Sequence, residues 1–326
     1  MTRILSGIQP TGEVHLGNYI GAFGRWAGEQ QPEHFFCIVD LHAMTVPYDP
    51  AALRERVIDV ACWLLAAGID PDVSVLFIQS HVREHTECAW ILNCIATMGE
   101  LGRMVQYKER SARQESVSVG LFDYPVLQAA DILLYGAEEV PVGADQQQHI
   151  ELTRDIAQRF NTRFGHTFVL PKATLPRAGA KVMDLQQVDR RMSKSVSSPQ
   201  GKILLSEGEG STRNKIMRAV TDSGTEIRAA PDKPGITNLL DLAAAVTGDE
   251  IDALEDRYAG RQYGELKRDL AEAVNELLRP VRKRYLELRS DPAMVSELLC
   301  KGADRAREVA CATMALVRDR TGLVHS

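Results

Sequence analysis

The sequence predicts an α/β fold in which a doubly wound parallel sheet is followed by an all-helical region. Over about the first 160 of the 326 residues, short apolar runs alternate with segments of helical periodicity. This alternation is typical of parallel strands covered by helices. From about Thr212 onward the pattern is almost wholly helical, and 326 residues with 44% hydrophobic content can bury a sizeable core.

Each expected strand is a short run rich in branched or aromatic residues, and each expected helix has helical periodicity. The expected strands are residues 4–8, 35–39, 73–78 and 140–143. The expected helices are residues 16–28, 50–67, 83–96, a helical group over 101–135, then 145–160, 263–288 and 292–317. Gly and Pro interrupt residues 161–200, which indicates loops. In such a Rossmann-like sheet, ligands bind at the carboxyl ends of strands, here residues 7–10, 40–42 and 79–81.

Composition limits the class of protein. We expect an α/β domain over residues 1–200, with a helical insertion at about 101–135, and a helical domain over 201–326. No apolar run reaches 18 residues and no signal-peptide layout is present, so a cytoplasmic protein without a membrane partner is expected. None of the six cysteines forms a C-x-x-C pair, so we expect reduced cysteines and no zinc ribbon.

A glycine-containing segment leads from the first expected strand into the first expected helix. It reads Pro10-Thr-Gly-Glu-Val-His15-Leu-Gly17-Asn18. Gly17 has no side chain, so a nucleotide could approach the backbone closely, and a helix N-terminus presents N–H groups to phosphate. His15 and Asn18 share a face of the first turn and could both donate to phosphate oxygens. The Walker sequence does not occur, which removes the P-loop explanation.

A second polar segment, Arg190-Arg191-Met192-Ser193-Lys194-Ser195, lies in the loop-rich stretch before the helical region. A loop of this kind can close over a ligand and bring Lys194 onto phosphate oxygens as a point charge. Taken alone it is usually just surface, so the prediction depends on its pairing with the first segment.

Together the two segments resemble the paired motifs of class I aminoacyl-tRNA synthetases. Two further stretches, Tyr124-Pro-Val-Leu-Gln-Ala-Ala-Asp131-Ile-Leu-Leu-Tyr135 and Pro141-Val-Gly143-Ala-Asp145-Gln146, resemble the bacterial tryptophanyl enzymes. The resemblance extends in order over nearly the whole chain. It implies that residues 1–200 are a class I synthetase catalytic domain and that residues 201–326 bind the tRNA anticodon, where the basic cluster Arg279, Arg282, Lys283 and Arg284 lies.

The resemblance also implies the reaction. The carboxylate of L-tryptophan attacks the α-phosphate of ATP, which gives tryptophanyl-adenylate and pyrophosphate, and the tryptophanyl group then passes to the 3′ end of tRNA(Trp). No enzyme nucleophile is needed, so catalysis rests on positioning and on stabilising phosphate charge. Mg²⁺ accompanies ATP, no metal ligated by the protein is expected, and relatives of this kind are homodimers.

Site residues follow from the matched positions. Catalytic roles are implied for Gln9, His15, Asn18 and Lys194. Contacts with ATP are implied for Gln9, Pro10, Thr11, Gly17, Asn18, Arg110, Gly143, Ala144, Asp145, Val182, Arg191, Met192, Ser193, Lys194 and Ser195. Contacts with tryptophan are implied for Leu5, His42, Gln128, Asp131 and Gln146. Asp131 would accept the indole N–H, and because a buried carboxylate without its donor is costly, phenylalanine would be rejected.

Four positions depart from the family pattern. Gln128 stands where bacterial relatives commonly have methionine, which affects the contact with the substrate ring. Arg110 and Arg191 each replace a lysine and keep the charge but not its geometry. Ala144 replaces an acidic residue beside Asp145. None of these changes removes a group that the reaction requires.

Three alternatives stay open at this point. A tyrosyl-tRNA synthetase has the same fold, and a phenol also donates to a carboxylate, so Asp131 alone does not separate the two. A non-catalytic paralogue that binds tryptophan or tRNA would not need His15, Gly17, Asn18 and Lys194 together. Another ATP-using ligase of the nucleotidyl-transfer superfamily would not need the helical C-terminal domain.

Overall fold

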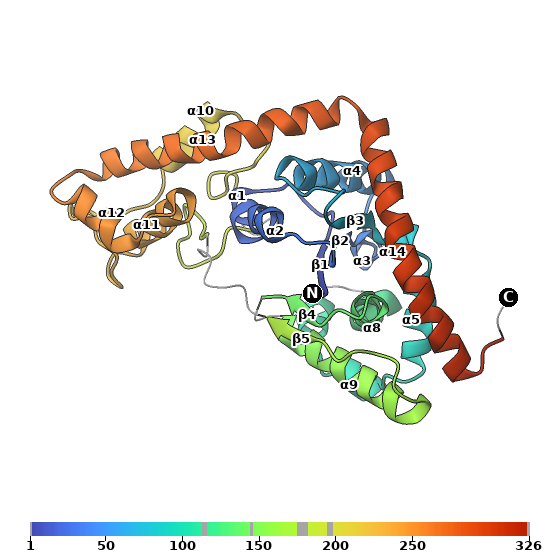
Figure 1. Cartoon of the computed structure of the whole chain (residues 1–326). Coiled ribbons are helices and arrows are strands. Elements are labelled where there is room, and N and C mark those ends of the chain that lie inside the picture. The colour runs from blue at the N-terminus through green and yellow to red at the C-terminus, as the bar shows by residue number, and fades with distance from the viewer. Residues whose placement is uncertain (1, 113–115, 144–145, 175–181, 194–197, 325–326) are drawn as a thin grey trace.

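A computed structural model describes residues 2–112, 116–143, 146–174, 182–193 and 198–324. Its centre is a five-stranded sheet of strand order β3-β2-β1-β4-β5, in which every pair of neighbours is parallel (Figure 1). The strands are β1 (Ile4–Ile8), β2 (His34–Ile38), β3 (Val75–Ile78), β4 (Glu139–Pro141) and β5 (Lys172–Thr174). The predicted parallel sheet is confirmed, and its strand order reverses between β1 and β4.

Both faces of the sheet are covered, as the alternation along β2 shows. Phe36 and Ile38 belong to one hydrophobic cluster, whereas Phe35 and Cys37 belong to the other. In Figure 1, α2 and α4 lie on one side of the sheet and α8 and α5 on the other. The helices of this part are α1 (Leu16–Asn18), α2 (Gly24–Glu29), α3 (Asp40–Ala43), α4 (Pro50–Ala66), α5 (Glu84–Asn93), α6 (Met98–Leu101), α7 (Val105–Ser111), α8 (Val119–Leu134) and α9 (Gln147–Phe164).

Two local features differ from the prediction. A π-helical turn, Tyr19–Phe23, joins α1 to α2, so the first helix is not regular. The expected loop over 161–200 is wrong at its start, because α9 runs on to Phe164 and Lys172–Thr174 forms the edge strand β5. A three-residue strand that is mostly exposed has too little hydrophobic alternation to be seen in the sequence.

The helical region consists of α10 (Glu209–Met217), α11 (Pro234–Thr247), α12 (Ile251–Tyr258), α13 (Tyr263–Arg289) and α14 (Pro292–Thr321). Figure 1 shows α10 to α12 beside α13 and away from the sheet, while α14 descends along the α/β part. The side chains of α14 enter the same hydrophobic cluster as those of α5 and α8, including Ala306, Ala310 and Met314. By its packing, the last helix therefore belongs to the α/β body and not to the helical domain in which the sequence placed it.

Two further expectations concern the cysteines and membrane-spanning helices. All six cysteines are free thiols, of which Cys37, Cys62 and Cys88 are buried. Among the helices of the described ranges, none is both long and apolar enough to cross a bilayer.

Candidate active site

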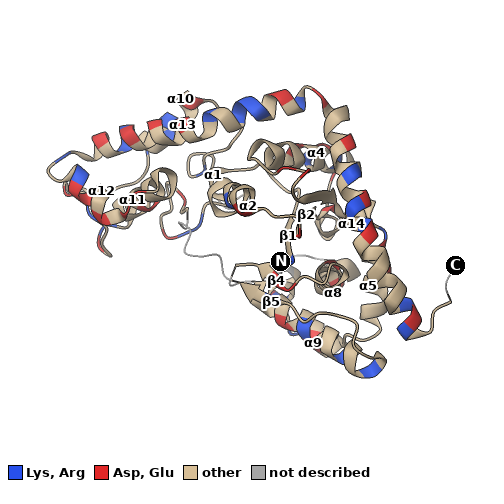
Figure 2. Cartoon of the chain, in the orientation of Figure 1, with Lys and Arg blue, Asp and Glu red and all other residues tan. Residues whose placement is uncertain are grey.

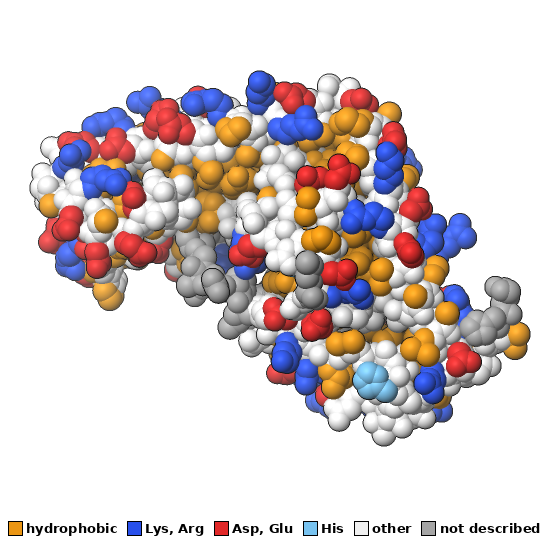
Figure 3. All heavy atoms as spheres, viewed as in Figure 1, with side chains coloured by type: hydrophobic (Ala, Val, Ile, Leu, Met, Phe, Trp, Pro, Cys, Tyr) orange, Lys and Arg blue, Asp and Glu red, His pale blue; other side chains and the backbone are white. Residues whose placement is uncertain are grey.

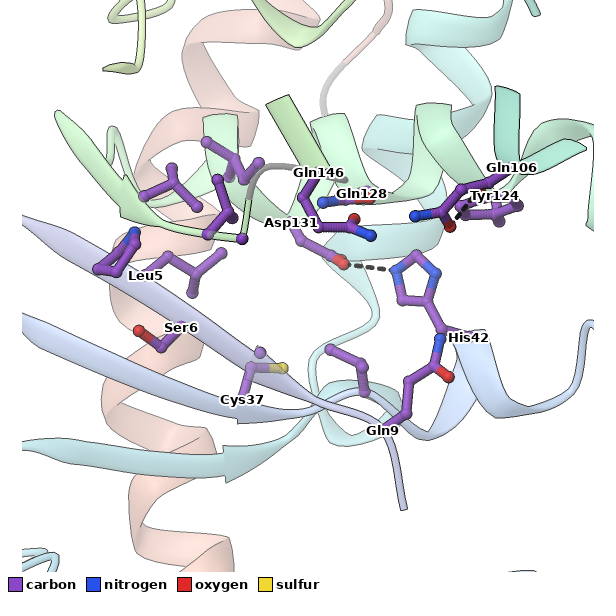
Figure 4. A pocket seen from close by; sticks show the side chains of 17 residues that line it. Leu5, Ser6, Gln9, Cys37, His42, Gln106, Tyr124, Gln128, Asp131 and Gln146 are labelled. Atoms are coloured by element: carbon purple, nitrogen blue, oxygen red, sulfur yellow. Dashed lines mark hydrogen bonds and ion pairs between the residues drawn. The ribbon is translucent and has the colours of Figure 1, made fainter. Parts of the chain in front are cut away.

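A cavity of about 370 Å³ opens where the strand order reverses, between β1 and β4 (Figure 4). This is the place at which doubly wound sheets bind ligands, because the helices that follow the two strands lie on opposite faces. Seven of the predicted site residues line it: Leu5, Gln9, His42, Gln128, Asp131, Gly143 and Gln146. The structure thus brings together residues from positions 5 to 146 of the chain.

Each element contributes a different kind of group. The end of β1 supplies Gln9, and α3 begins directly after β2 and supplies His42. Gln128 and Asp131 are three residues apart on α8, so they share one face of that helix. Gly143 follows β4 and accepts a hydrogen bond from the backbone N–H of Gln146, at 2.9 Å between nitrogen and oxygen.

The Asp131 carboxylate is the charged group of this cavity, and it is almost fully buried. Gln79 donates from Nε2 to Oδ1 at 2.7 Å and to Oδ2 at 2.9 Å. His85 Nδ1 lies 2.6 Å from Oδ1, and His42 Nε2 lies 2.8 Å from Oδ2. A carboxylate has about four lone-pair directions, so this one is fully hydrogen-bonded by protein groups.

The ionisation of Asp131 follows from these partners. Burial by itself raises the pKa of Asp131, but the charge of His85 and the hydrogen bonds from His42 and His85 lower that pKa well below its usual range. The carboxylate therefore stays ionised at neutral pH and accepts hydrogen bonds only. A donor on the substrate is the complement that such a group selects.

Sequence reasoning missed the groups behind this carboxylate. Gln79 and His85 are fully buried, and His85 Nε2 lies 2.8 Å from the hydroxyl of Tyr135. The available signal was weak: Gln79 was named only as the end of an expected strand, and His85 lies in the polar first turn of α5. Tyr124 and Gln106 also line the cavity without having been predicted.

Cys37 lines the same cavity, and its thiol is not activated. Burial raises the pKa of the Cys37 thiol well above its ordinary value, and the charges of Asp131 and Asp40 add to that shift. A thiol in this setting keeps its proton and is a poor nucleophile.

The first motif forms the entry to α1. His15 is almost fully buried, and its backbone N–H donates to Oδ1 of Asn18 at 3.1 Å. The N–H of Leu16 donates to the carbonyl of Ile203 at 2.8 Å, so this one helix-terminal donor is already used by the protein. Pro10 is buried and Thr11 half-buried, directly after Gln9 of the cavity.

The second motif packs against the first. A Cβ atom built on Gly17 would lie 3.7 Å from Cβ of Met192 and 3.0 Å from Nδ1 of His15, so the lack of a side chain at residue 17 allows this close approach. Met192 is buried, and its N–H donates to the carbonyl of Val182 at 3.0 Å. Arg191 forms an antiparallel bridge with Met183. The described part of this segment is thus anchored by an apolar side chain, a contact that its polar sequence did not predict.

Some predicted residues cannot be placed in this way. Ser193 is the last described residue before residue 198, and it interacts with another group of the protein. Ala144, Asp145, Lys194 and Ser195 lie outside the described residues, as does the side chain of Arg110 in α7.

The basic cluster of α13 is mostly engaged within the protein. Arg279 pairs with Glu209 at 2.8 Å, and Arg284 pairs with Glu287 at 3.1 Å. Arg282 is half-buried and donates to the carbonyl of Leu205 at 2.9 Å. Figure 2 marks acidic and basic residues along the same helix, and Figure 3 shows side chains of the two signs intermingled over that face of the molecule. Lys283 is exposed and carries the cluster's remaining free charge within the described residues.

Comparison with known proteins gives the family. The family model described as tRNA synthetases class I (W and Y) matches residues 1–279. A tryptophan–tRNA ligase of Streptomyces avermitilis is 51% identical over 99% of this chain and 97% of its own length. One of Caldanaerobacter subterraneus is 47% identical, over 99% of each chain.

Solved structures agree with these relatives. A tryptophanyl-tRNA synthetase of Mycoplasma pneumoniae has a TM-score of 0.89 at 35% identity, over 99% of this chain and 98% of its own. The enzyme of Campylobacter jejuni, complexed with ADP and tryptophan, has a TM-score of 0.85 at 37% identity, over 99% of this chain and 100% of its own. This chain therefore belongs to the class I tRNA synthetases of the tryptophan and tyrosine group, and within them to the bacterial-type tryptophan–tRNA ligases.

Proposed function

We propose that the cavity between β1 and β4 binds L-tryptophan and that the two motif segments beside it bind ATP. As a tryptophan–tRNA ligase, the chain joins the two in a first step and charges tRNA(Trp) in a second. The observation that carries the proposal is the ionised Asp131 carboxylate, buried in the cavity at the strand-order switch. Gln9 of this cavity leads within six residues to His15.

In the first step, a carboxylate oxygen of tryptophan attacks the α-phosphorus of ATP and the bond to the β-phosphate bridging oxygen breaks. The products are tryptophanyl-adenylate and pyrophosphate. We assign binding of the indole N–H to Asp131, and contacts with the rest of the amino acid to Leu5, His42, Gln128 and Gln146. A substrate without an N–H donor is then disfavoured, because it offers nothing to the buried carboxylate.

We assign positioning of ATP to residues of the first motif and its neighbours: Gln9, Pro10, Thr11, Gly17, Asn18, Gly143 and Val182. We assign stabilisation of the triphosphate to His15, Asn18, Lys194 and the hydroxyls of Ser193 and Ser195, with Arg110, Ala144, Asp145, Arg191 and Met192 nearby. Mg²⁺ enters with ATP on its phosphates.

In the second step, the 3′-terminal ribose hydroxyl of tRNA(Trp) attacks the activated carbonyl and AMP leaves. We assign anticodon binding to the part formed by α10 to α13. A deletion after residue 210 cannot test this, because it also removes α14 and exposes the hydrophobic cluster that α14 helps to form. Lys283→Glu is a sharper test: it should raise the KM for tRNA and leave pyrophosphate exchange unchanged. Lys301→Glu, at an exposed lysine of α14, is the matched control.

We also propose that the chain is a cytoplasmic homodimer, as translation enzymes of this family imply. Two large apolar side chains, Trp90 of α5 and Met98 of α6, are 71% and 75% exposed, and we assign them to the contact between subunits. Trp90→Glu should then halve the mass measured by light scattering. An unchanged mass for the variant would place the contact elsewhere.

The activity is tested by amino-acid-dependent exchange of pyrophosphate into ATP with tryptophan, tyrosine and phenylalanine. Exchange with tryptophan alone supports both the reaction and the pocket. Exchange with tyrosine would keep the mechanism and overturn the substrate. No exchange with any of the three, in folded protein that binds ATP, would leave a non-catalytic paralogue.

A further inference from the structure

The partners of Asp131 divide into two groups by their position. His42 lines the cavity on the substrate side. Gln79 and His85 are fully buried and do not line it, so they contact the carboxylate from behind. Figure 4 shows the hydrogen bond between His42 and Asp131 at the wall of the cavity.

The hydrogen atoms behind the carboxylate can be assigned from the chemistry of each group. An ionised carboxylate only accepts hydrogen bonds, so Nδ1 of His85 must carry the proton that lies between it and Oδ1, 2.6 Å away. Tyr135 is fully buried, and burial raises the pKa of its phenol well above the ordinary value, so it keeps its own proton. At 2.8 Å, the Tyr135 hydroxyl is hydrogen-bonded to Nε2 of His85, so both ring nitrogens of His85 have a partner.

Tyr135, His85 and Asp131 therefore form one continuous hydrogen-bonded chain. The Tyr135 hydroxyl holds Nε2 of His85, and Nδ1 of His85 holds Oδ1 of Asp131. Gln79, which bonds both oxygens, fixes the plane of the carboxylate. What remains adjustable is the fourth hydrogen bond, from His42 to Oδ2.

We infer that His85, held by Tyr135, is a positioning residue that sets tryptophan selectivity by aiming Oδ2 of Asp131 at the indole N–H. His42 occupies that direction until the indole N–H replaces it, so one donor is exchanged for another at the same oxygen. A ring that displaces His42 but has no N–H leaves Oδ2 short of a donor. The inference rests on the proposed tryptophan pocket.

The test compares tryptophan with its benzothiophene analogue, in which sulfur replaces the indole N–H. The readout is the ratio of kcat/KM for the two substrates in pyrophosphate exchange, with kcat and KM determined separately. His85→Leu removes the donor to Oδ1, His85→Asn keeps an amide donor near the place of Nδ1, and Tyr135→Phe removes only the phenolic O–H. His34→Asn is the matched control, because His34 is a buried histidine at the start of β2 that does not line the cavity.

We expect His85→Leu to lower the ratio by about tenfold or more. Asp131 then loses its hydrogen bond at Oδ1, and Oδ2 is no longer held toward the indole N–H. The loss should lie mainly in the KM for tryptophan, with the KM for ATP unchanged. His85→Asn should restore most of the ratio, Tyr135→Phe should lower it by about threefold or more, and His34→Asn should not change it.

Asp131→Asn separates this inference from the pocket assignment. If Asp131→Asn leaves the ratio at its wild-type value, the pocket assignment itself fails. If Asp131→Asn abolishes the preference while His85→Leu and Tyr135→Phe keep it, the pocket stands and the role of His85 is overturned. Should His85→Leu not fold, Tyr135→Phe decides, because it removes one oxygen atom and leaves the packing of the ring in place.

Discussion

Gly302 of α14 lies directly against Leu76 of β3: a Cβ atom at residue 302 would be 1.8 Å from the Leu76 carbonyl oxygen. Nearby, Arg305 donates to the carbonyls of Pro71 and Ser74 at 2.5 and 3.0 Å. The last helix therefore packs directly on the backbone of β3, so no side-chain rotation can make room for a methyl group at residue 302.

Gly302→Ala should accordingly lower the free energy of unfolding by about 3 kcal/mol or more, because helix and strand must separate. Gly210→Ala is the matched control, since residue 210 is also helical and nothing lies within 4 Å of the added atom. We expect the control to be as stable as the wild type or more stable by up to about 1 kcal/mol. Urea unfolding measures both, and equal stabilities would contradict the packing of α14.

Gly201 occupies a similar position beside the second motif. A Cβ atom there would be 2.1 Å from a carboxylate oxygen of Asp184, and that carboxylate accepts the N–H groups of Gln186 and Gln187 at 2.7 and 2.9 Å. Gly201→Ala should displace Asp184 and, with it, the start of the second motif. This should reduce the single-turnover rate of adenylate formation by about tenfold or more. Gly208→Ala, in open space, should keep the wild-type rate. An unaffected rate in Gly201→Ala would mean that the packing of Gly201 on Asp184 does not help to position ATP.

Asp131→Asn removes the charge that the indole N–H is proposed to meet. We expect the preference for tryptophan over phenylalanine to fall by the equivalent of roughly 1.5–3 kcal/mol, while ATP binding stays nearly intact. Competitive pyrophosphate exchange gives the preference, and equilibrium binding gives the ATP affinity. Unchanged rejection of phenylalanine would remove Asp131 from the pocket assignment.

Lys194→Ala removes the cation that the second motif is proposed to bring to the triphosphate. Adenylate formation should slow far more than tryptophan binding weakens, because the charge acts on phosphate and not on the amino acid. Rapid-quench kinetics beside tryptophan titration separate the two effects. A wild-type rate would rule out this role for the residue.

Glu100 predicts a pH dependence of stability. It accepts hydrogen bonds from the Arg159 guanidinium at 2.5 and 3.2 Å, and these lower the pKa of Glu100 although burial raises it. Because the folded pKa lies below the unfolded value of about 4.3, the ion pair stabilises the fold above that pH. The contribution is lost as the pH falls through the folded pKa.

Glu100→Gln should therefore lower the free energy of unfolding by about 1 kcal/mol at pH 7, with a smaller difference below pH 4.3. Glutamine can still cap the helix that begins after Thr97, so the substitution removes the charge and one acceptor for Arg159 and keeps the cap. Glu151→Gln, at an exposed position of α9, is the control. A deficit that is the same at every pH would contradict the ion-pair origin.

The sequence by itself determined strands β1 to β4 of the sheet and the two motifs. The strand Ile4–Ile8 was predicted with its observed bounds, and His34–Ile38 lies one residue from the prediction. Alternation of apolar runs with helical periodicity is a local property, and parallel order follows from the helices between the strands. For the same reason the cavity could be expected at the ends of strands, with Gln9 and His42 in it.

Tertiary structure decided what depends on distant partners. Asp131 could be named from its motif, but the three side chains that hold it come from residues 42, 79 and 85, on separate elements. The packing of α14 on β3 and the ion pair of Arg279 with Glu209 also join residues that are far apart in the sequence. A periodic pattern shows which face of a helix is apolar, whereas the surface that covers this face, and the charge that meets each side chain, are fixed only when the elements pack.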